Sequence, residues 1–151
     1  NAPHLGVDVV VMTGNVAQVF ISDDSWAAAL TAANNALDLN GRLVFETRDP
    51  AFRGWEEWTR ERSLTVKQTR SGDVESWVDL TSVDQSLVSF RWTFHCLETA
   101  AVIESDSTLR CRNLDELESS LSQAGFVIDQ VRDAPDRPSR EFVVIASPRR
   151  H

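Results

Sequence analysis

Cysteine is scarce in this chain of 151 residues, where Cys96 and Cys111 are the only two. Two cysteines are too few for the disulfide framework of a small secreted domain. They also form no paired metal-binding motif, because only His95 lies near Cys96. We therefore expect two free, partly buried thiols and no metal site.

Long apolar runs and an excess of positive charge are also lacking. No apolar run approaches the roughly 20 residues that span a bilayer, and no basic-then-apolar leader opens the chain. These absences predict a cytoplasmic protein with no membrane partner. The 23 acidic residues outnumber the 15 basic ones and give a formal net charge of −8. Nucleic-acid binding normally needs a basic surface, so this balance argues against it.

The opening of the chain is unusual, because Asn1-Ala2-Pro3 is no natural initiation sequence. A strand is expected to begin only a few residues later. An expression scar or a trimmed fragment explains such a start, and neither belongs in fold reasoning. We expect a truncated protein.

The first fifty residues alternate between strand and helix patterns. Val7 to Met12 reads VDVVVM, a β-branched run typical of a strand buried on both faces of a parallel sheet. Ser22 is the expected N-cap of a helix from Asp23 to Leu39, and Asn40-Gly41 its stop. Leu43 to Glu46 is the next strand. Strand, helix and strand with short links predict a parallel crossover unit.

The middle of the chain changes to a period of two. A further helix is expected from Asp49-Pro50 to near Arg62. Residues 63–112 then predict a four-stranded antiparallel meander, inserted within a single domain that covers 1–151. In the strand from Val88 to Cys96, apolar and polar side chains alternate strictly.

The end of the chain returns to mixed architecture. Asn113 and Glu116 form the pattern of a capping box at the start of a helix. Two strands are expected after it, Phe126 to Val131 and Glu141 to Ala146. A long polar loop, expected to be mobile, joins them.

The order of these segments resembles a known family. DVVVMTGNVAQVF, a helix and then NGRLVFETRDP resemble strand 4, helix D and strand 5 of class I S-adenosylmethionine-dependent methyltransferases. LDELESSLSQAGFVIDQVRD followed by EFVVIASP resembles the last helix and strands 6 and 7. The meander resembles the substrate-side insertion of small-molecule methyltransferases related to glycine N-methyltransferase.

This resemblance covers nearly the whole chain and implies its fold class and activity. The implied fold is α/β, the C-terminal half of a Rossmann-like methyltransferase sheet (strands 4, 5, 6 and 7) with an inserted antiparallel meander. The implied activity is methyl transfer from S-adenosylmethionine to a small molecule, whose identity and acceptor atom stay open.

One departure from the family limits what the chain alone should do. The family's cofactor site uses an acidic residue and glycines after strand 1, and a second acidic residue after strand 2. The residues before Val7 are too few to build those strands. We therefore expect weak or absent binding of S-adenosylmethionine, and no activity by this chain alone.

The candidate cofactor-binding residues follow the first strand. Thr13, Gly14 and Asn15 leave it at the edge where open α/β sheets bind ligands. The resemblance implies that this loop contacts the methionine end of the cofactor and the acceptor. Gln18 follows in a segment that could close over the methyl donor. A plain turn that uses the backbone tolerance of Gly14 and Asn15 is the alternative.

Glu46 and His95 are the candidate catalytic residues. Glu46 ends a buried strand, where a carboxylate needs either a partner such as Arg48 or a ligand. His95 is a possible base, because histidine changes its charge near neutral pH, although a surface histidine explains it as well. Four tryptophans could line an acceptor pocket or pack the helix against the meander: Trp55, Trp58, Trp77 and Trp92.

Assembly is predicted from the first strand. If the family's preceding strand is missing, Val7 to Met12 becomes a flat apolar edge of the kind that pairs with another chain. We therefore expect a homodimer. Two alternatives to the enzyme stay open: a non-catalytic α+β domain that self-associates or binds a partner, and a ligand-binding α+β barrel with an aromatic interior. Cofactor binding by the isolated chain distinguishes the enzyme from the non-catalytic domain.

Overall fold

The computed structural model describes residues 5–149, so the Asn1-Ala2-Pro3 opening lies outside the described residues. The chain divides into two compact units. Unit 1 comprises residues 5–52 and 110–149 of the described chain, and unit 2 comprises Arg53–Leu109. Each unit has its own four-stranded sheet. The expected single domain 1–151 with an insertion at 63–112 stays a prediction.

Unit 1 contains a mixed sheet in the order β1-β2-β8-β7. Its strands are β1 (Val7–Met12), β2 (Leu37–Arg48), β7 (Phe126–Asp133) and β8 (Glu141–Pro148). The pair β1 and β2 is parallel, whereas β8 runs antiparallel to both β2 and β7. The predicted parallel pairing of β1 and β2 is therefore confirmed.

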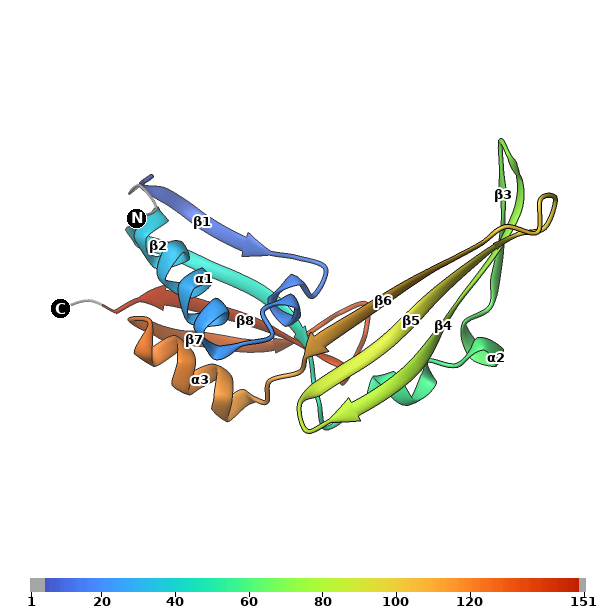
Figure 1. Ribbon diagram of the computed structural model, residues 1–151. Coiled ribbons are helices and arrows are strands. Elements are labelled where there is room, and N and C mark those ends of the chain that lie inside the picture. Colours follow the sequence, from blue (N-terminus) through green and yellow to red (C-terminus); the bar gives the residue numbers. More distant parts are fainter. Residues whose placement is uncertain (1–4, 150–151) are drawn as a thin grey trace. The chain divides into compact units, whose positions relative to one another are not determined.

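Two helices, α1 (Asp23–Ala36) and α3 (Leu114–Gln123), cover the same face of this sheet (Figure 1). Trp26 and Leu30 of α1 are almost fully buried, as are Leu117 and Leu121 of α3. They pack on alternate residues of β2 and β8, which point to that face because side chains alternate along a strand. The core of unit 1 therefore lies between these helices and the sheet.

The first helix ends three residues earlier than the sequence predicts, at Ala36 rather than Leu39. Leu37 is extended and 3% exposed, because it already belongs to β2 and pairs with Val7. Gly41 lies within a register shift of this pair, where a Cβ atom would come within 3.0 Å of the Val7 carbonyl oxygen. Asn40-Gly41 is therefore an irregularity in the strand, and the prediction of a helix stop there was wrong.

The capping box of α3 is confirmed. The Asn113 side chain accepts a hydrogen bond from the Glu116 backbone, and the Glu116 carboxylate accepts one from the Asn113 backbone. These two bonds satisfy backbone donors that have no partner inside the helix. The helix consequently begins where the sequence predicts.

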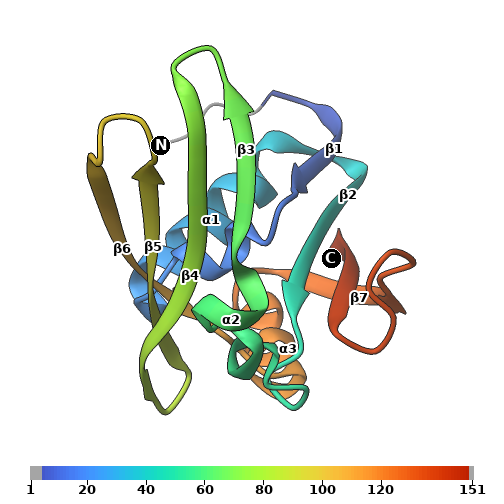
Figure 2. The ribbon, with the colours of Figure 1, turned by 90° about the vertical axis from the view of Figure 1, so that its right-hand side faces the viewer.

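Unit 2 is an antiparallel sheet in the order β3-β4-β5-β6, shown side by side in Figure 2. It confirms the predicted meander, with strands β3 (Thr65–Thr69), β4 (Gly72–Asp84), β5 (Leu87–Cys96) and β6 (Val102–Arg110). The long helix expected from Asp49-Pro50 was wrong. A left-handed residue, Arg53 with φ 53°, interrupts that segment, which forms a 3-10 turn, η2 (Gly54–Glu57), and a short helix, α2 (Arg60–Ser63).

Candidate functional site

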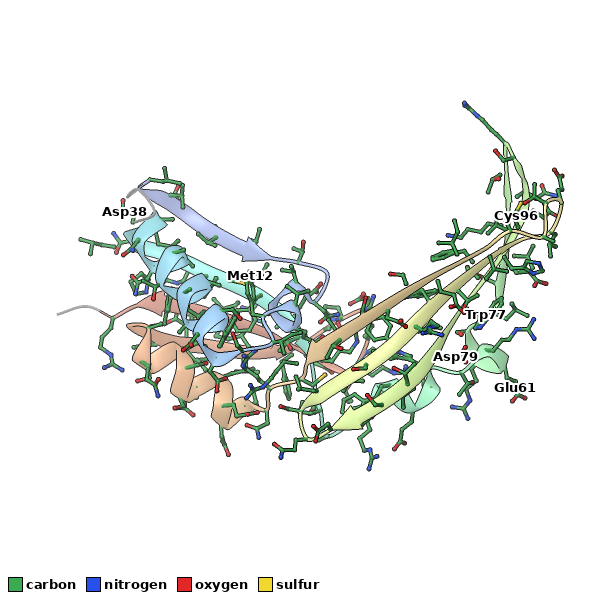
Figure 3. All side chains as sticks on the ribbon, viewed as in Figure 1. Met12, Asp38, Glu61, Trp77, Asp79 and Cys96 are labelled. Carbon is green, nitrogen blue, oxygen red and sulfur yellow. The ribbon has the colours of Figure 1, made fainter. Side chains whose placement is uncertain are left out.

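The loop after β1 lies where β1 and β2 end on the same edge of the sheet, as parallel strands do (Figure 1). Met12, labelled in Figure 3, is the last residue of β1. Gly14 and Asn15 both adopt positive φ angles, 66° and 58°. The Gly14 N–H donates a hydrogen bond to the Glu46 carboxylate on β2. Two separately predicted site residues are thus brought together.

Asn15 connects this loop to the start of β8. Its side chain is 4% exposed, and Nδ2 donates to Oε1 of Glu141 at 3.0 Å. Glu141 is equally buried, and it accepts a second hydrogen bond of 2.7 Å from Arg137. The Arg137 guanidinium therefore anchors the polar loop between β7 and β8 to the same site.

Glu141 and Arg137 were missed by sequence reasoning. The available signal was a carboxylate at the terminus of a buried strand. The same reasoning selected Glu46 at the end of its predicted strand, and it applies equally to Glu141 at the start of another. Glu141 pairs with Arg48 in the register between β8 and β2. The antiparallel direction of β8 brings its first residue to the edge where β2 ends, a placement that depends on strand pairing and not on local sequence.

Gln18, in the 3-10 turn η1 (Val16–Val19), lies inside the protein at 1% exposure. Its Oε1 accepts a 2.9 Å hydrogen bond from Arg48, and its Nε2 donates to the Cys111 sulfur at 2.9 Å. Both ends of the amide are thus bound to protein groups. Any ligand contact by Gln18 would have to replace one of these partners.

Burial sets the ionisation of this interior cluster. Burial lowers the pKa of the Arg48 guanidinium from its ordinary value, while the nearby Glu141 carboxylate opposes that shift. Burial also raises the pKa of the Cys111 thiol to about 11, although Arg48 and Gln18 act in the other direction. Cys111 is therefore protonated at neutral pH and is no nucleophile.

One buried acceptor in this site has no protein partner among residues 5–149. It is Oδ1 of Asn15, whose Nδ2 is already engaged by Glu141. Buried acceptors are nearly always hydrogen-bonded, so an unmatched one needs a donor from a water molecule or a ligand. Because a carboxylate can only accept, the bond to Glu141 must come from the Asn15 amide nitrogen, and the oxygen is the atom without a partner.

His95 lies in unit 2, on β5, whereas Glu46 lies in unit 1. The His95 Nδ1 is 3.5 Å from a carboxylate oxygen of Glu75, and Glu75 is also 3.9 Å from Arg60. The imidazole thus has a carboxylate neighbour that could hold it in one orientation. The two predicted catalytic residues belong to different units.

A separate groove of about 680 Å³ lies between α1 and α3, and none of the predicted site residues lines it. Arg110 and Arg112 form part of its wall, but their guanidinium groups already bind Asp23 and backbone carbonyls of Phe20 and Ile21. Within residues 5–149, no three histidine, cysteine or acidic side chains are grouped as metal ligands. No helix of that part is long and apolar enough to cross a membrane.

Neither a protein-family model nor a curated protein matches this chain. Solved structures do. An S-adenosylmethionine-dependent methyltransferase from Clostridium acetobutylicum ATCC 824 superposes with a TM-score of 0.72 at 13% identity, over 96% of this chain and 59% of its own. An amino pentose methyltransferase from Micromonospora echinaspora gives 0.69 at 15% identity, over 95% and 59%. A sugar N-methyltransferase from Streptoalloteichus sp. ATCC 53650 gives 0.69 at 13%, over 96% and 57%.

This chain therefore spans less than two thirds of the length of the structures that it resembles. At such low identity the likeness concerns the fold. The strand order β1-β2-β8-β7 with an antiparallel meander is the predicted methyltransferase topology, and the superpositions agree with it. The chain has the fold of S-adenosylmethionine-dependent methyltransferases.

Proposed function

We propose that this chain forms part of a methyltransferase that transfers a methyl group from S-adenosylmethionine to a small molecule. The observation that carries the proposal is the loop Thr13–Asn15, held at the carboxyl edge of β1 and β2 by bonds to both Glu46 and Glu141. Open α/β sheets bind ligands at this edge. The methyltransferase neighbours, three of which are described as acting on sugars or glycopeptides, support the reaction class.

The residues present fit a ligand with a hydrogen-bond donor. Thr13 and Gly14 are exposed, so backbone and hydroxyl groups of the loop are accessible. Asn15 Oδ1 is an unmatched but buried acceptor, which would bond to an ammonium or hydroxyl group of a ligand only when the loop moves to expose it. When bound, the cofactor supplies the electrophilic methyl group. The loop residues would hold its methionine end in the geometry that an in-line displacement needs.

Glu46 and His95 are the proposed catalytic residues, and each is described within its own unit. Glu46 is partly exposed at the ligand edge, and its bond to Gly14 joins its position to that of the loop. His95, beside Glu75, would serve as a base where the acceptor carries a proton to be removed. Gln18 would act indirectly, by keeping Arg48 and the turn after the loop in place.

The test is a nuclear magnetic resonance titration of the 151-residue chain with S-adenosylhomocysteine, with adenosine as the control. We expect shifts of the Thr13, Gly14 and Asn15 amides with S-adenosylhomocysteine and smaller ones with adenosine. The affinity should be millimolar or weaker. We expect the 151-residue chain to lack the glycine-rich loop and the acidic residues of the family's cofactor site. Each hydrogen bond to a charged group that is lost in this way costs roughly 1.5–3 kcal/mol, which takes a micromolar site beyond millimolar.

Two outcomes would contradict the proposal. Unchanged loop amides up to the solubility limit of S-adenosylhomocysteine would reject the site itself. Micromolar affinity would show that the cofactor site is built differently from the family pattern.

A further inference from the structure

The sheet of unit 2 has one face that is occupied by its own polar contacts. Arg91 on β5 forms an ion pair of 2.7 Å with Asp106 on β6. Trp77 donates its indole N–H to Asp79 at 2.9 Å, both on β4 and labelled in Figure 3. These side chains share a face, because Trp77 and Asp79 are two residues apart on β4 and Asp79 is paired directly with Arg91 on β5. The polar groups of this face satisfy one another.

The opposite face is apolar and only partly covered. The register pairs Leu80 with Phe90, and Trp58 covers that end with its ring 4.8 Å from the Phe90 ring. Further along β5, Trp92 and Phe94 remain 37% and 40% exposed. Their rings stack, with centroids 5.9 Å apart and an interplanar angle of 19°. Exposed aromatic surface of this kind often marks a binding site.

Only one of the four candidate tryptophans has a ring available to a ligand. Trp55 is 5% exposed, and Trp58 packs on Phe90. Trp77 lies on the polar face, with Arg60 4.6 Å above its ring and its N–H bound to Asp79. Trp92 is the tryptophan that the structure leaves open.

A pair of hydroxyl groups borders the two open rings. Thr65 on β3 and Ser76 on β4 are paired, with their oxygens 3.1 Å apart. Ser76 is in turn paired with Phe94 on β5, so the hydroxyls lie on the same face as the aromatic rings. Ligand sites commonly combine aromatic surface with a few such polar groups.

We propose that Trp92 and Phe94, bordered by Thr65 and Ser76, form a binding surface for the ring of the methyl acceptor. The acceptor is a cyclic compound with an apolar ring face and hydroxyl or amino groups on its rim. The ring lies on the aromatic pair, and a rim group meets the hydroxyls; an amino group gains further attraction from the indole. The identification of the bound compound as the methyl acceptor rests on the proposed function. Binding of a ring to this surface does not depend on a cofactor.

The experiment follows the five indole N–H signals and the Phe94 amide of the 151-residue chain during titration. The probe is trans-4-aminocyclohexanol, and its acyclic control, 6-amino-1-hexanol, carries the same two polar groups. We expect saturable shifts at Trp92 and Phe94 and none at Trp77. The acyclic compound should bind about threefold to fivefold more weakly, since stacking at an exposed aromatic site is modest.

Variants separate the binding surface from the rest of the sheet. Phe94→Leu and Trp92→Ala should abolish the preference for the ring, whereas Trp77→Phe on the opposite face should retain it. Phe94→Leu keeps an apolar side chain, so it tests the surface even where Trp92→Ala fails to fold. Equal binding of the two compounds, or an unchanged preference in Phe94→Leu, would overturn the inference.

Three further outcomes distinguish it from neighbouring proposals. If Trp92→Ala removes self-association in sedimentation, a second copy covers this surface and the inference is wrong. If ring binding occurs while S-adenosylhomocysteine leaves Thr13–Asn15 unchanged, the proposed function fails and the ring-binding surface stands. If only the ring fails to bind, the proposed function stands without this surface.

Discussion

At the scale of single residues, Glu141 connects two parts of the site, because it binds both Asn15 and Arg137 while only 4% exposed. Glu141→Gln keeps the shape but removes the charge opposite Arg137. We expect the free energy of unfolding in urea to fall by roughly 1.5–3 kcal/mol. Glu118→Gln on the exposed side of α3 should change it by less than about 0.5 kcal/mol. Equal effects of the two substitutions would contradict this role for Glu141.

Cys111 should make stability fall in alkaline solution. Its thiol has a pKa raised from 9.0 to about 11 in the folded protein, so unfolding releases its proton between these values. The stabilisation is complete below pH 9 and lost as the pH rises toward 11, on the order of 2 kcal/mol in all. The chain has no tyrosine and a single lysine, Lys67, so few other groups titrate in this window.

Thermal unfolding between pH 8 and pH 11 provides the measurement for Cys111. Cys111→Ala should flatten the alkaline decline of the melting temperature, although the loss of its contact with Gln18 lowers the starting value. Cys96→Ala, at a cysteine of intermediate exposure, should keep the decline. If the melting temperature of Cys111→Ala still falls between pH 8 and pH 11 as in the unmodified chain, a group other than Cys111 causes the decline.

At the scale of elements, Gly41 decides how β1 and β2 pair. An alanine Cβ there would lie 2.7 Å from Leu37 Cδ2 and 3.0 Å from the carbonyl oxygens of Asp38 and Val7. Because two of these atoms are backbone, the strands must shift. We expect Gly41→Ala to cost about 1–3 kcal/mol and to speed amide exchange along β1. Gly6→Ala, in open space at φ 63°, should cost only its backbone strain of about 1 kcal/mol.

Elements with a strong local signal were predictable from the sequence, and those set by distant contacts were not. The α3 capping box and the parallel pair of β1 and β2 follow from cap chemistry and β-branched runs. The early end of α1 was not predictable, because Leu37 leaves the helix to pair with Val7. In the site, Gly14 and Glu46 were found as neighbours of strand ends, whereas Glu141 reaches them only through the antiparallel return of β8.

At the scale of the whole molecule, the helices of unit 1 cover only one face of its sheet among the described residues of that unit. Both helices pack on the face formed by Leu43, Phe45 and their neighbours. On β1, Val9 and Val11 are 51% and 60% exposed. Parallel strands are usually covered on both faces, so this exposed apolar surface favours a further partner.

We propose that the partner of this surface is a second copy of the chain, which pairs through β1. The strand order places β1 at the edge of its sheet, and its regular pairing with β2 extends from Val9 to Met12. That stretch contains no charge or proline to discourage pairing with another strand. Two copies related by a two-fold axis would pair β1 antiparallel with β1.

Sedimentation at micromolar concentration should therefore show a homodimer. Val11→Lys should convert it to a monomer, because a lysine on an edge strand discourages pairing with another strand. Val131→Lys, at a 42% exposed valine on β7 at the other edge of the same sheet, should leave the dimer intact. A monomeric unmodified chain, or a dimer that survives Val11→Lys, would mean that another surface decides the assembly.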